Sequence, residues 1–416
     1  VKKVLIISYF YPPANFVGGD RTASWAKYLH ESGYYPIVIT RQWNEGQTDL
    51  VDKLENNLLK VEYNNTHEIH RLPYKRSLRD RCSNYKWLKP LQKALTLVEL
   101  IASNFFIRAL PYSNFYFYGK QLIQDQPDIT MVIASGRPFQ SFFIGHRLKK
   151  GFATINWIPD YRDEWTTFQN TASQPISQRW LTWLDSISEK RWLSNASLFL
   201  TVSENWGLSI NKLVEKKGAA ILNGFDDAEP INYKRSTNEK LIISYVGTLY
   251  PNQNIEVILN AAKGNKNLHF QFFGIELNNG QKDRIEKYQK ELTISIFPRI
   301  SKEQMYGLLT STDVYFLSGF EAVKGWYPVK LFDYFNWNRP IILCPSDNDV
   351  MEQFIHETGS GFIANSVEEC EEVLTHLLRV KQGQEILNLQ RNEAAGAQYS
   401  RYHQAKILAH VLDQLD

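Results

Sequence analysis

Short apolar runs alternate with helix-like stretches along the whole chain, and this alternation limits the possible folds more than any other feature. Strands that are joined by helices pair in parallel, and the helices then cover both faces of the sheet. The sequence therefore predicts an α/β protein built on parallel sheets. The predicted strands are residues 4–8, 37–40, 69–72, 130–134, 154–157, 198–202, 220–222, 242–246, 269–273, 295–297, 314–317, 341–344 and 362–364.

The length and composition predict two soluble domains. A chain of 416 residues is long enough for two domains of ordinary size, each with its own core. Its 43% hydrophobic and 22% charged residues are typical of a soluble globular protein. The polar stretch 226–240 separates two groups of predicted strands, so we predict domains at 1–225 and 241–399 with a linker between them. Residues 400–416 are predicted to form an amphipathic helix.

Residues 324–343 carry the strongest indication of a ligand site. They read as a loop, a short helix and a strand, with Pro328 suited to the first helical turn. A helix that begins here directs its free N–H groups and the positive end of its dipole into the loop, which favours a phosphate group. Lys330 adds a positive charge, and Asp333, one turn on, can accept hydrogen bonds from ribose hydroxyls. The stretch predicts a nucleoside-diphosphate site, although an ordinary αβ unit with a surface lysine and aspartate fits the same residues.

A glycine-containing loop near the start of the chain is a second candidate. The predicted strand 4–8 is followed by the loop 9–20, which includes Gly18 and Gly19, and then by a helix. Glycines before a helix let a ligand approach the backbone closely. The pattern is not the G-x-G-x-x-G fingerprint of dinucleotide-binding domains, which argues against a nicotinamide or flavin enzyme.

Six segments, spread in order over nearly the whole chain, resemble motifs of the family 4 glycosyltransferases. That family opens with a Tyr-Phe-Pro-Pro-type loop and a Gly-Gly pair, and it has an Arg-Asp-x-Trp-like segment after its fifth strand. A Thr-Val-Ser strand end and an Asn-Gly-Phe-Asp junction follow, then a strand with Gly-x-x and a Pro-x-Lys-Leu-Phe-Glu-Tyr donor loop. The matching segments here are residues 9–19, 161–165, 201–203, 223–226, 245–248 and 328–334.

The resemblance implies two facing Rossmann-like domains with parallel sheets, the GT-B architecture of glycosyltransferases. In that fold a C-terminal helix, residues 400–416 here, crosses back to the first domain; the alternative is a helix packed on the second domain alone. The resemblance also implies a retaining glycosyltransferase that needs no metal and no cofactor. It would move a sugar from a nucleotide-diphosphate donor to a glycan acceptor, and the departing diphosphate would take the acceptor's proton.

Ligands of parallel α/β sheets bind beyond the carboxyl ends of the strands, so the resemblance assigns most donor contacts to loops of the second domain. The predicted donor-binding residues are Gly18, Gly19, Gly247, Thr248, Gly274, Arg299, Tyr327, Lys330, Leu331 and Asp333. The predicted catalytic residues are Asp163, Glu321 and Lys330, and the predicted acceptor-side residues are Arg137, Asp160 and Arg162. For Asp160 and Asp163, capping and loop hydrogen bonds explain the residues equally well.

The chain departs from the family pattern in the donor loop. Many relatives have two glutamates eight positions apart there, whereas this chain has Gly325 and Asp333. Glu321, the nearest acid upstream, is the candidate replacement for the first glutamate. Two alternatives to a transferase stay open: a sugar-nucleotide 2-epimerase of the same fold, and a sugar-nucleotide-binding partner without turnover.

Asp347 and Asp349 form the Asp-x-Asp pattern with which other sugar transferases hold a divalent cation. They lie between a predicted strand and a helix that begins near Val350, so helix capping explains them better, and we predict no metal site. The three cysteines are distant from one another in sequence and form no metal pattern, which fits a reducing compartment.

Residues 71–120 form a basic and aromatic segment. They hold ten Lys or Arg against two acids, a net charge of +8, whereas the whole chain has +3. This mixture favours an anionic membrane surface, and no recognised nucleic-acid module surrounds it. We therefore predict a cytoplasmic protein, bound peripherally to the inner face of the cell membrane, that acts on a glycan or polyprenyl-diphosphate-linked acceptor in surface polysaccharide synthesis. The alternative is that the aromatic residues pack under an insertion and the charges are merely solvated.

Overall fold

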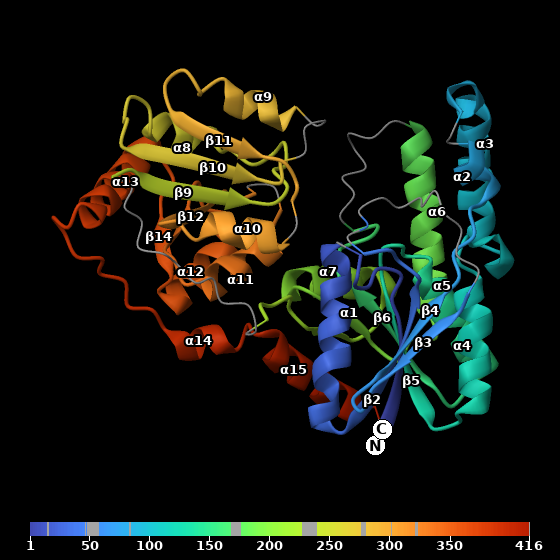
Figure 1. Cartoon of the computed structure of the whole chain (residues 1–416). Helices are drawn as coiled ribbons and strands as arrows, with labels where there is room; N and C mark the ends of the chain where they lie inside the picture. Colours follow the sequence, from blue (N-terminus) through green and yellow to red (C-terminus); the bar gives the residue numbers. More distant parts are fainter. Residues whose placement is uncertain are drawn as a thin grey trace. The chain divides into compact units, whose positions relative to one another are not determined.

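The structure is a computed structural model, and it describes residues 1–14, 16–45, 47, 58–82, 85–167, 176–226, 239–275, 280–300, 302–320 and 323–415. The described chain divides into two compact units. Unit 1 comprises residues 1–222 together with 404–416, and unit 2 comprises residues 223–403. Each unit is a sheet packed among helices (Figure 1).

The sheet of unit 1 has the strand order β3-β4-β2-β1-β5-β6-β7-β8. All neighbouring strands are parallel except β3 and β4, which form an antiparallel pair at the edge. The strands are β1 (Lys2–Ile7), β2 (Tyr34–Arg41), β3 (Lys60–Tyr63), β4 (Glu68–Leu72), β5 (Ile129–Ser135), β6 (Asn156–Tyr161), β7 (Phe199–Thr201) and β8 (Gly218–Ala220). The helices are α1 (Val17–Tyr28), η1 (Leu29–Ser32), α2 (Leu78–Cys82), η2 (Lys86–Leu88), α3 (Lys89–Ser103), η3 (Ile107–Ala109), α4 (Asn114–Asp125), α5 (Ser141–Gly151), α6 (Ile176–Leu193), α7 (Glu204–Val214) and α15 (Arg401–Asp413).

The core of unit 1 is assembled from both ends of the chain. In β1 the four residues from Val4 to Ile7 are all buried, as expected for a parallel strand covered on both faces. Leu408 and Leu412 of α15 belong to the same buried cluster as Val4. The Asp413 carboxylate of α15 also accepts hydrogen bonds from the Lys2 ammonium (2.9 Å) and the Tyr34 hydroxyl (2.8 Å). Helix α15 is therefore an integral part of unit 1.

The sheet of unit 2 is parallel throughout, with the order β11-β10-β9-β12-β13-β14. The strands are β9 (Leu241–Val246), β10 (Leu268–Phe273), β11 (Thr293–Phe297), β12 (Val314–Leu317), β13 (Ile341–Leu343) and β14 (Gly361–Ile363). The helices are α8 (Glu256–Ala261), α9 (Gln281–Glu286), α10 (Lys302–Leu309), α11 (Val329–Asn336), α12 (Val350–Thr358), α13 (Val367–Lys381) and α14 (Glu393–Ala397).

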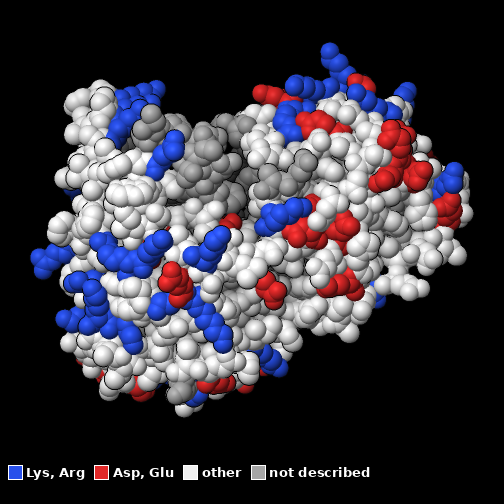
Figure 2. Space-filling model, turned by 180° about the vertical axis from the view of Figure 1, so that it is seen from behind, with Lys and Arg blue, Asp and Glu red and all other residues white. Residues whose placement is uncertain are grey.

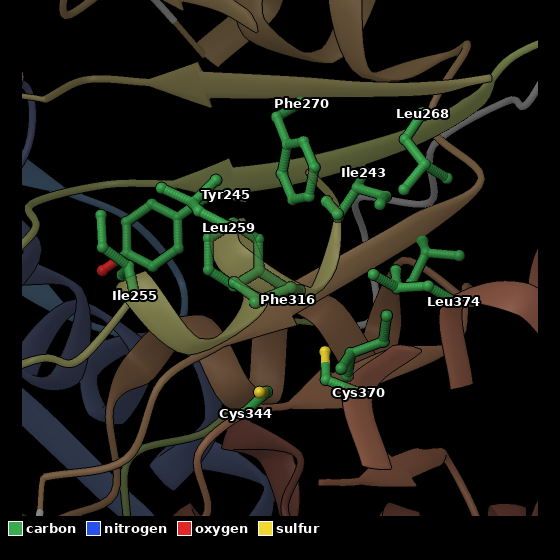
Figure 3. Close-up of a cluster of buried hydrophobic side chains, with 14 of the residues drawn as sticks. Ile243, Tyr245, Ile255, Leu259, Leu268, Phe270, Phe316, Cys344, Cys370 and Leu374 are labelled. Atoms are coloured by element: carbon green, nitrogen blue, oxygen red, sulfur yellow. The ribbon is translucent and has the colours of Figure 1, made fainter. Parts of the chain in front are cut away.

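One core of unit 2 lies between its sheet and helices α8 and α13. Phe270 and Phe316 from the sheet, Leu259 from α8 and Leu374 from α13 are all buried in it (Figure 3). Helix α13 begins with a local signal, because the Ser366 hydroxyl accepts the Glu369 N–H at 3.1 Å. Cys344 and Cys370 are free thiols in this core.

The α/β fold with two parallel, Rossmann-like sheets that the sequence predicts is confirmed, and every predicted strand overlaps a strand of the structure. Strand β3 was not predicted. It is four residues long and partly exposed, so it lacks the buried apolar run that marks the other strands. Of the predicted linker, residues 227–238 lie outside the described residues. Within the described part of the chain, no helix combines the length and the apolar character that crossing a membrane requires.

Candidate functional site

In unit 2 the strand order reverses at β9, which has β10 on one side and β12 on the other. Ligands of open parallel sheets bind beyond the carboxyl ends of the strands at such a switch point. Gly247 follows β9 and Gly274 follows β10, and both have left-handed backbone angles, with φ of +95° and +74°. A Cβ at Gly274 would lie 3.8 Å from the Gly247 Cα. The two glycines thus lie close together at the switch point, where side chains would narrow the space available to a ligand.

Lys330 joins this group from helix α11. Pro328 is the N-cap residue of α11, one position before the place that the sequence predicted for it. The Lys330 ammonium donates hydrogen bonds to the Tyr245 hydroxyl (2.7 Å) and the Thr248 carbonyl (3.0 Å). A Cβ at Gly247 would lie 3.6 Å from its Nζ. The fold therefore brings Lys330 together with Gly247, Thr248 and Gly274, which come far before it in the sequence.

Both hydrogen-bond acceptors of the Lys330 ammonium are uncharged groups. Its Nζ lies 4.0 Å from the centroid of the Tyr245 ring, and its two hydrogen-bond acceptors are a hydroxyl and a carbonyl. Burial lowers the pKa of Lys330 to about 7, an effect that the negative charge of Asp333 partly opposes. A phosphate group at this position would supply a full negative charge and would favour the protonated lysine.

Two residues that the sequence analysis did not single out, Tyr334 and Gln253, hold the loop after β9. The Tyr334 hydroxyl, one turn after Lys330, accepts the Val246 N–H at 2.6 Å. Gln253 accepts hydrogen bonds from the Tyr245 hydroxyl (3.0 Å) and the Tyr250 N–H (3.1 Å) and donates to the Ser318 carbonyl (2.9 Å). Tyr334 could have been found from the sequence, because it comes four residues after Lys330 and therefore lies on the same side of the helix.

The remaining predicted donor residues of unit 2 differ in how accessible they are. Arg299 is exposed just after β11, and Asp333 is partly exposed on α11. Tyr327 is partly exposed, and its ring stacks on Phe332 with centroids 5.9 Å apart. Leu331 is fully buried, and its side chain packs in the interior of unit 2. The predicted catalytic residue Glu321 lies outside the described residues.

Asp347, the first acid of the Asp-x-Asp pattern, caps helix α12, as predicted. The Asp347 carboxylate accepts the N–H groups of Asp349 (3.2 Å), Met351 (2.9 Å) and Glu352 (3.1 Å). The Asp349 carboxylate accepts the Gly325 N–H. Both acids therefore serve to organise backbone. The described residues contain no cluster of three or more side chains suited to binding a metal ion.

In unit 1, Gly18 and Gly19 lie inside the first turn of α1, not before it as the sequence suggested. A Cβ at Gly18 would overlap the Arg162 guanidinium, and one at Gly19 would lie 2.9 Å from the Tyr11 Cα. The space above Gly18 is thus occupied by a side chain of the same unit. These glycines allow the loops after β1 and β6 to pack closely on α1.

Arg162 gathers the predicted acceptor-side residues at the carboxyl ends of β5 and β6. Its Nε donates to the Gly136 carbonyl (2.7 Å), and an NH2 group donates to the Arg137 carbonyl (3.1 Å). The Arg137 guanidinium in turn pairs with the Asp163 carboxylate at 3.2 Å, with both side chains partly exposed. Burial raises the pKa of Asp163, and Arg137 opposes that shift. Arg137, Arg162 and Asp163 therefore form one cluster that solvent can reach.

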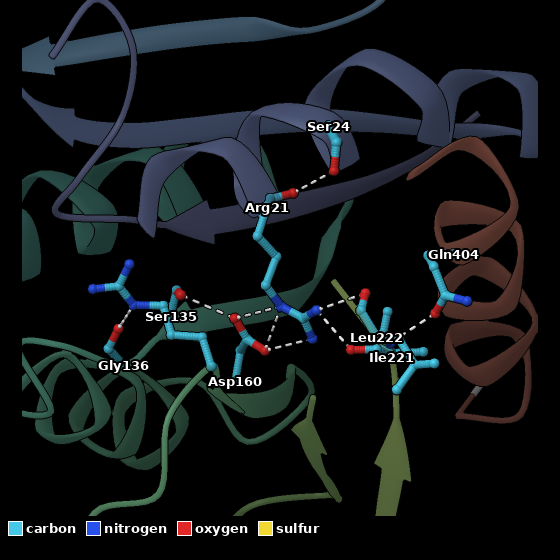
Figure 4. A network of polar contacts seen from close by, with 9 residues as sticks. Arg21, Ser24, Ser135, Gly136, Asp160, Ile221, Leu222 and Gln404 are labelled. Carbon is cyan, nitrogen blue, oxygen red and sulfur yellow. Dashed lines mark hydrogen bonds and ion pairs between the residues drawn. The ribbon is translucent and has the colours of Figure 1, made fainter. Parts of the chain in front are cut away.

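Asp160 lies below this cluster and is fully buried. Its carboxylate accepts hydrogen bonds from the Arg21 guanidinium at 3.0 to 3.3 Å and from the Ser135 hydroxyl at 2.9 Å (Figure 4). Arg21 also donates to the carbonyls of Ile221 (2.6 Å) and Leu222 (3.1 Å). The network joins α1, β5, β6 and the end of β8, so Asp160 organises the sheet and does not face an acceptor.

Glu189 of α6 holds the loop that carries Arg162 and Asp163. Its carboxylate is buried and accepts hydrogen bonds from the Tyr161 hydroxyl (2.7 Å) and the Thr166 hydroxyl (2.5 Å). Burial raises the pKa of Glu189 to about 7, while these hydrogen bonds oppose the shift. The loop is therefore anchored directly before Arg162 and again three residues after Asp163.

No model of a protein family matches the chain, and no curated protein matches its sequence. Its fold is similar to solved structures. Sucrose-phosphate synthase from Thermosynechococcus elongatus has a TM-score of 0.65 at 13% identity, over 100% of this chain and 99% of that chain. HepE from Anabaena in complex with UDP-glucose has a TM-score of 0.57 at 10% identity, over 100% of both chains. The lipopolysaccharide outer core galactosyltransferase WaaB has a TM-score of 0.53 at 12% identity, over 100% of both chains. The predicted GT-B architecture is thereby confirmed.

Proposed function

We propose that the chain is a retaining, metal-independent family 4 glycosyltransferase that takes a sugar from a nucleotide-diphosphate donor. The observation that carries this proposal is the Lys330 ammonium at the switch point of unit 2, next to Gly247 and hydrogen-bonded to the Thr248 carbonyl. Two features support a diphosphate ligand here: glycines line the place, and both hydrogen-bond acceptors of the lysine are uncharged. The similarity of the fold to HepE, which was solved with UDP-glucose, supports a nucleotide-sugar donor.

In the proposed reaction Lys330 and the N-terminus of α11 stabilise the charge that develops on the departing diphosphate. No cofactor is needed for this step. Asp347 caps α12 and Asp349 accepts the Gly325 N–H, so we assign the charge of the diphosphate to Lys330 and not to a bound metal. The departing oxygen then accepts the proton of the acceptor hydroxyl on the face from which it leaves. Asp163, held by Arg137, is the proposed partner that orients the acceptor.

We further propose that the acceptor is a glycan linked to a lipid, used in surface polysaccharide synthesis at the inner face of the cell membrane. The basic segment 71–120 supports an anionic membrane partner. The similarity of the fold to WaaB, a lipopolysaccharide outer core galactosyltransferase, supports a glycan acceptor. Both observations bear on the acceptor and on where the reaction takes place, and neither depends on the donor site.

A donor panel tests the proposed function. The purified chain is incubated with UDP-, GDP- and ADP-linked hexoses, and free nucleoside diphosphate and sugar isomers are both measured. Slow release of nucleoside diphosphate from one donor, lost in Lys330→Met, supports a transferase. Interconversion of the sugar without release would indicate the 2-epimerase instead. Binding without either reaction would indicate a non-catalytic partner.

We also expect donor affinity to depend on pH. Burial lowers the pKa of Lys330 to about 7 in the empty site, and a bound diphosphate should raise it again. The affinity should therefore be highest below about pH 7 and should fall as the pH rises above it, because binding must then take up a proton. Calorimetric titration of nucleoside diphosphate over about pH 6 to 9, in buffers of different ionisation enthalpy, measures this uptake. Lys330→Met is the control and should lose the pH dependence; an unchanged profile in that variant would contradict this role of the lysine.

A further inference from the structure

Helix α3 is an apolar helix that unit 1 scarcely covers. Of its fifteen residues, all of which the structure describes, only Ser103 is buried. Leu91, Leu97 and Val98 are exposed, Val98 to 62%. A helix on the surface of a soluble domain normally turns its apolar stripe to the core. On α3, Leu95, Leu100 and Ile101 are partly buried, whereas the apolar side chains of Leu91, Leu97 and Val98 remain open to the surroundings of the molecule.

Helix α6 presents a second apolar surface. Trp180, Trp183 and Ile187 follow one another at spacings of three and four residues, which places them on one side of the helix. All three are exposed, Trp183 to 57%. These residues lie outside the segment 71–120, so the sequence analysis did not connect them with a membrane.

The two helices meet near the C-terminal end of each. The Arg191 guanidinium, one turn after Ile187 on α6, lies 5.1 Å from the centroid of the Phe105 ring and donates to the Asn104 carbonyl. Phe105 and Phe106, just after α3, are themselves exposed. Figure 1 shows both helices extending past the end of the sheet that lies opposite the chain terminus marked N. Because β1 starts at that terminus, they extend on the side of the strands' carboxyl ends, where Arg162 and Asp163 lie.

The charge around α3 limits what this surface can bind. Residues 75–108 contain eight Lys or Arg and two acids, Asp80 and Glu99. Both acids pair with Arg79, each at 2.9 Å. On the face of the molecule shown in Figure 2, unit 1, on the left, carries many Lys and Arg and few acids. Only some aromatic residues of the segment 71–120 belong to this surface. Tyr112 and Phe115 are buried, whereas Trp87 is 77% exposed.

We propose that the interface surface, defined as α3, residues 85–87 and 105–106, and the exposed side of α6, inserts into the headgroup region of an anionic lipid bilayer. Tryptophan and phenylalanine prefer this depth, and Lys86, Lys89 and Lys93 contact the negative headgroups. An acidic protein would match the charge but would not need so much exposed aromatic and aliphatic area. The inference deepens the proposed function, because it brings the cluster around Asp163 to the surface where a lipid-linked acceptor lies.

The test uses flotation of the full chain with vesicles and needs no turnover, so it stands apart from the donor panel. Equal mixtures of phosphatidylglycerol and phosphatidylcholine should carry the chain to the top of the gradient, and pure phosphatidylcholine should carry far less. Trp180→Ser with Trp183→Ser should reduce partitioning about tenfold or more, through lost apolar insertion. Lys89→Gln with Lys93→Gln should reduce it on anionic vesicles alone and should flatten its salt dependence.

Ile386→Ser is the matched control, because Ile386 is an exposed apolar residue of unit 2 outside the interface surface. It should float like the unchanged chain. Equal flotation of the tryptophan variant and the unchanged chain would overturn the proposal. So would a stable dimer in solution that the tryptophan variant converts to monomer without any change in flotation, since the surface would then be a contact between two copies.

Discussion

Nucleoside diphosphate should bind about 10- to 150-fold more weakly to the Lys330→Ala variant than to the unchanged chain, whereas free nucleoside should bind equally well to both. The lysine lies at the switch point of unit 2 with a hydroxyl and a carbonyl as acceptors, at 2.7 and 3.0 Å. A phosphate oxygen would form a charge-assisted hydrogen bond with it, and such bonds contribute roughly 1.5–3 kcal/mol. The nucleoside has no phosphate and should not sense the change.

Calorimetric titration with nucleoside diphosphate and with nucleoside measures both affinities. Lys330→Met is the matched variant, because it keeps most of the stem that lies over Tyr245. Lys330→Arg should not restore affinity, since a planar guanidinium does not replace a point charge in a tight loop. Asp333→Asn should weaken both ligands, because it removes a charged acceptor for ribose hydroxyls. A ratio of the two affinities that stays the same in Lys330→Ala would show that the phosphates bind elsewhere.

Asp160→Ala should lower the free energy of unfolding of unit 1 by about 3–5 kcal/mol. The substitution leaves the Arg21 guanidinium buried without its counter-ion, and taking an unpaired charge out of water is costly. The free energy of unfolding of Asp160→Asn should lie between those of Asp160→Ala and the unchanged chain, because the asparagine amide oxygen still accepts one hydrogen bond. The loss should appear as instability of the unit, since Asp160 has no exposed surface through which it could contact an acceptor.

Urea unfolding followed by tryptophan fluorescence suits this measurement, because nine of the eleven tryptophans lie in residues 1–222. Asp128→Ala is the control, since its carboxylate is exposed and its ion pair with Lys3 (2.8 Å) should contribute less than about 1 kcal/mol. If Asp160→Ala unfolds at the same urea concentration as the control, the buried pair of Asp160 and Arg21 does not stabilise the sheet. A role of Asp160 in binding the acceptor would then be supported instead.

Buried apolar runs made the strands predictable from the sequence. Residues 4–7 and 341–343 are apolar throughout because parallel strands are covered on both faces. The helix start at Val17 was harder to predict, since Gly18 and Gly19 are typical of loops. Only the close approach of Tyr11 and Arg162 in three dimensions explains two glycines in the first turn.

The donor-site lysine could be predicted because a local pattern, Pro328 followed by Lys330 and Asp333, describes it. The environment of Asp160 could not, since its partner Arg21 is 139 positions away and no local pattern joins them. Likewise, the sequence of 71–120 predicts an aromatic and basic segment but not which aromatic side chains are buried. Tyr112 and Phe115 fill the interior of unit 1, whereas Trp87 and Phe106 remain outside.

The position of α15 in unit 1 has a consequence for biosynthesis. The ribosome makes residues 1–222 first, but Leu408 and Leu412 of their core come only after all of unit 2 has been made. Domains usually fold one after another as they emerge, with the N-terminal domain first. Here the core of unit 1 stays incomplete, without Leu408 and Leu412, until nearly two hundred further residues have emerged. Unit 2, which is continuous in sequence, is thus the unit able to finish folding first, and nascent unit 1 is the part that would need a chaperone.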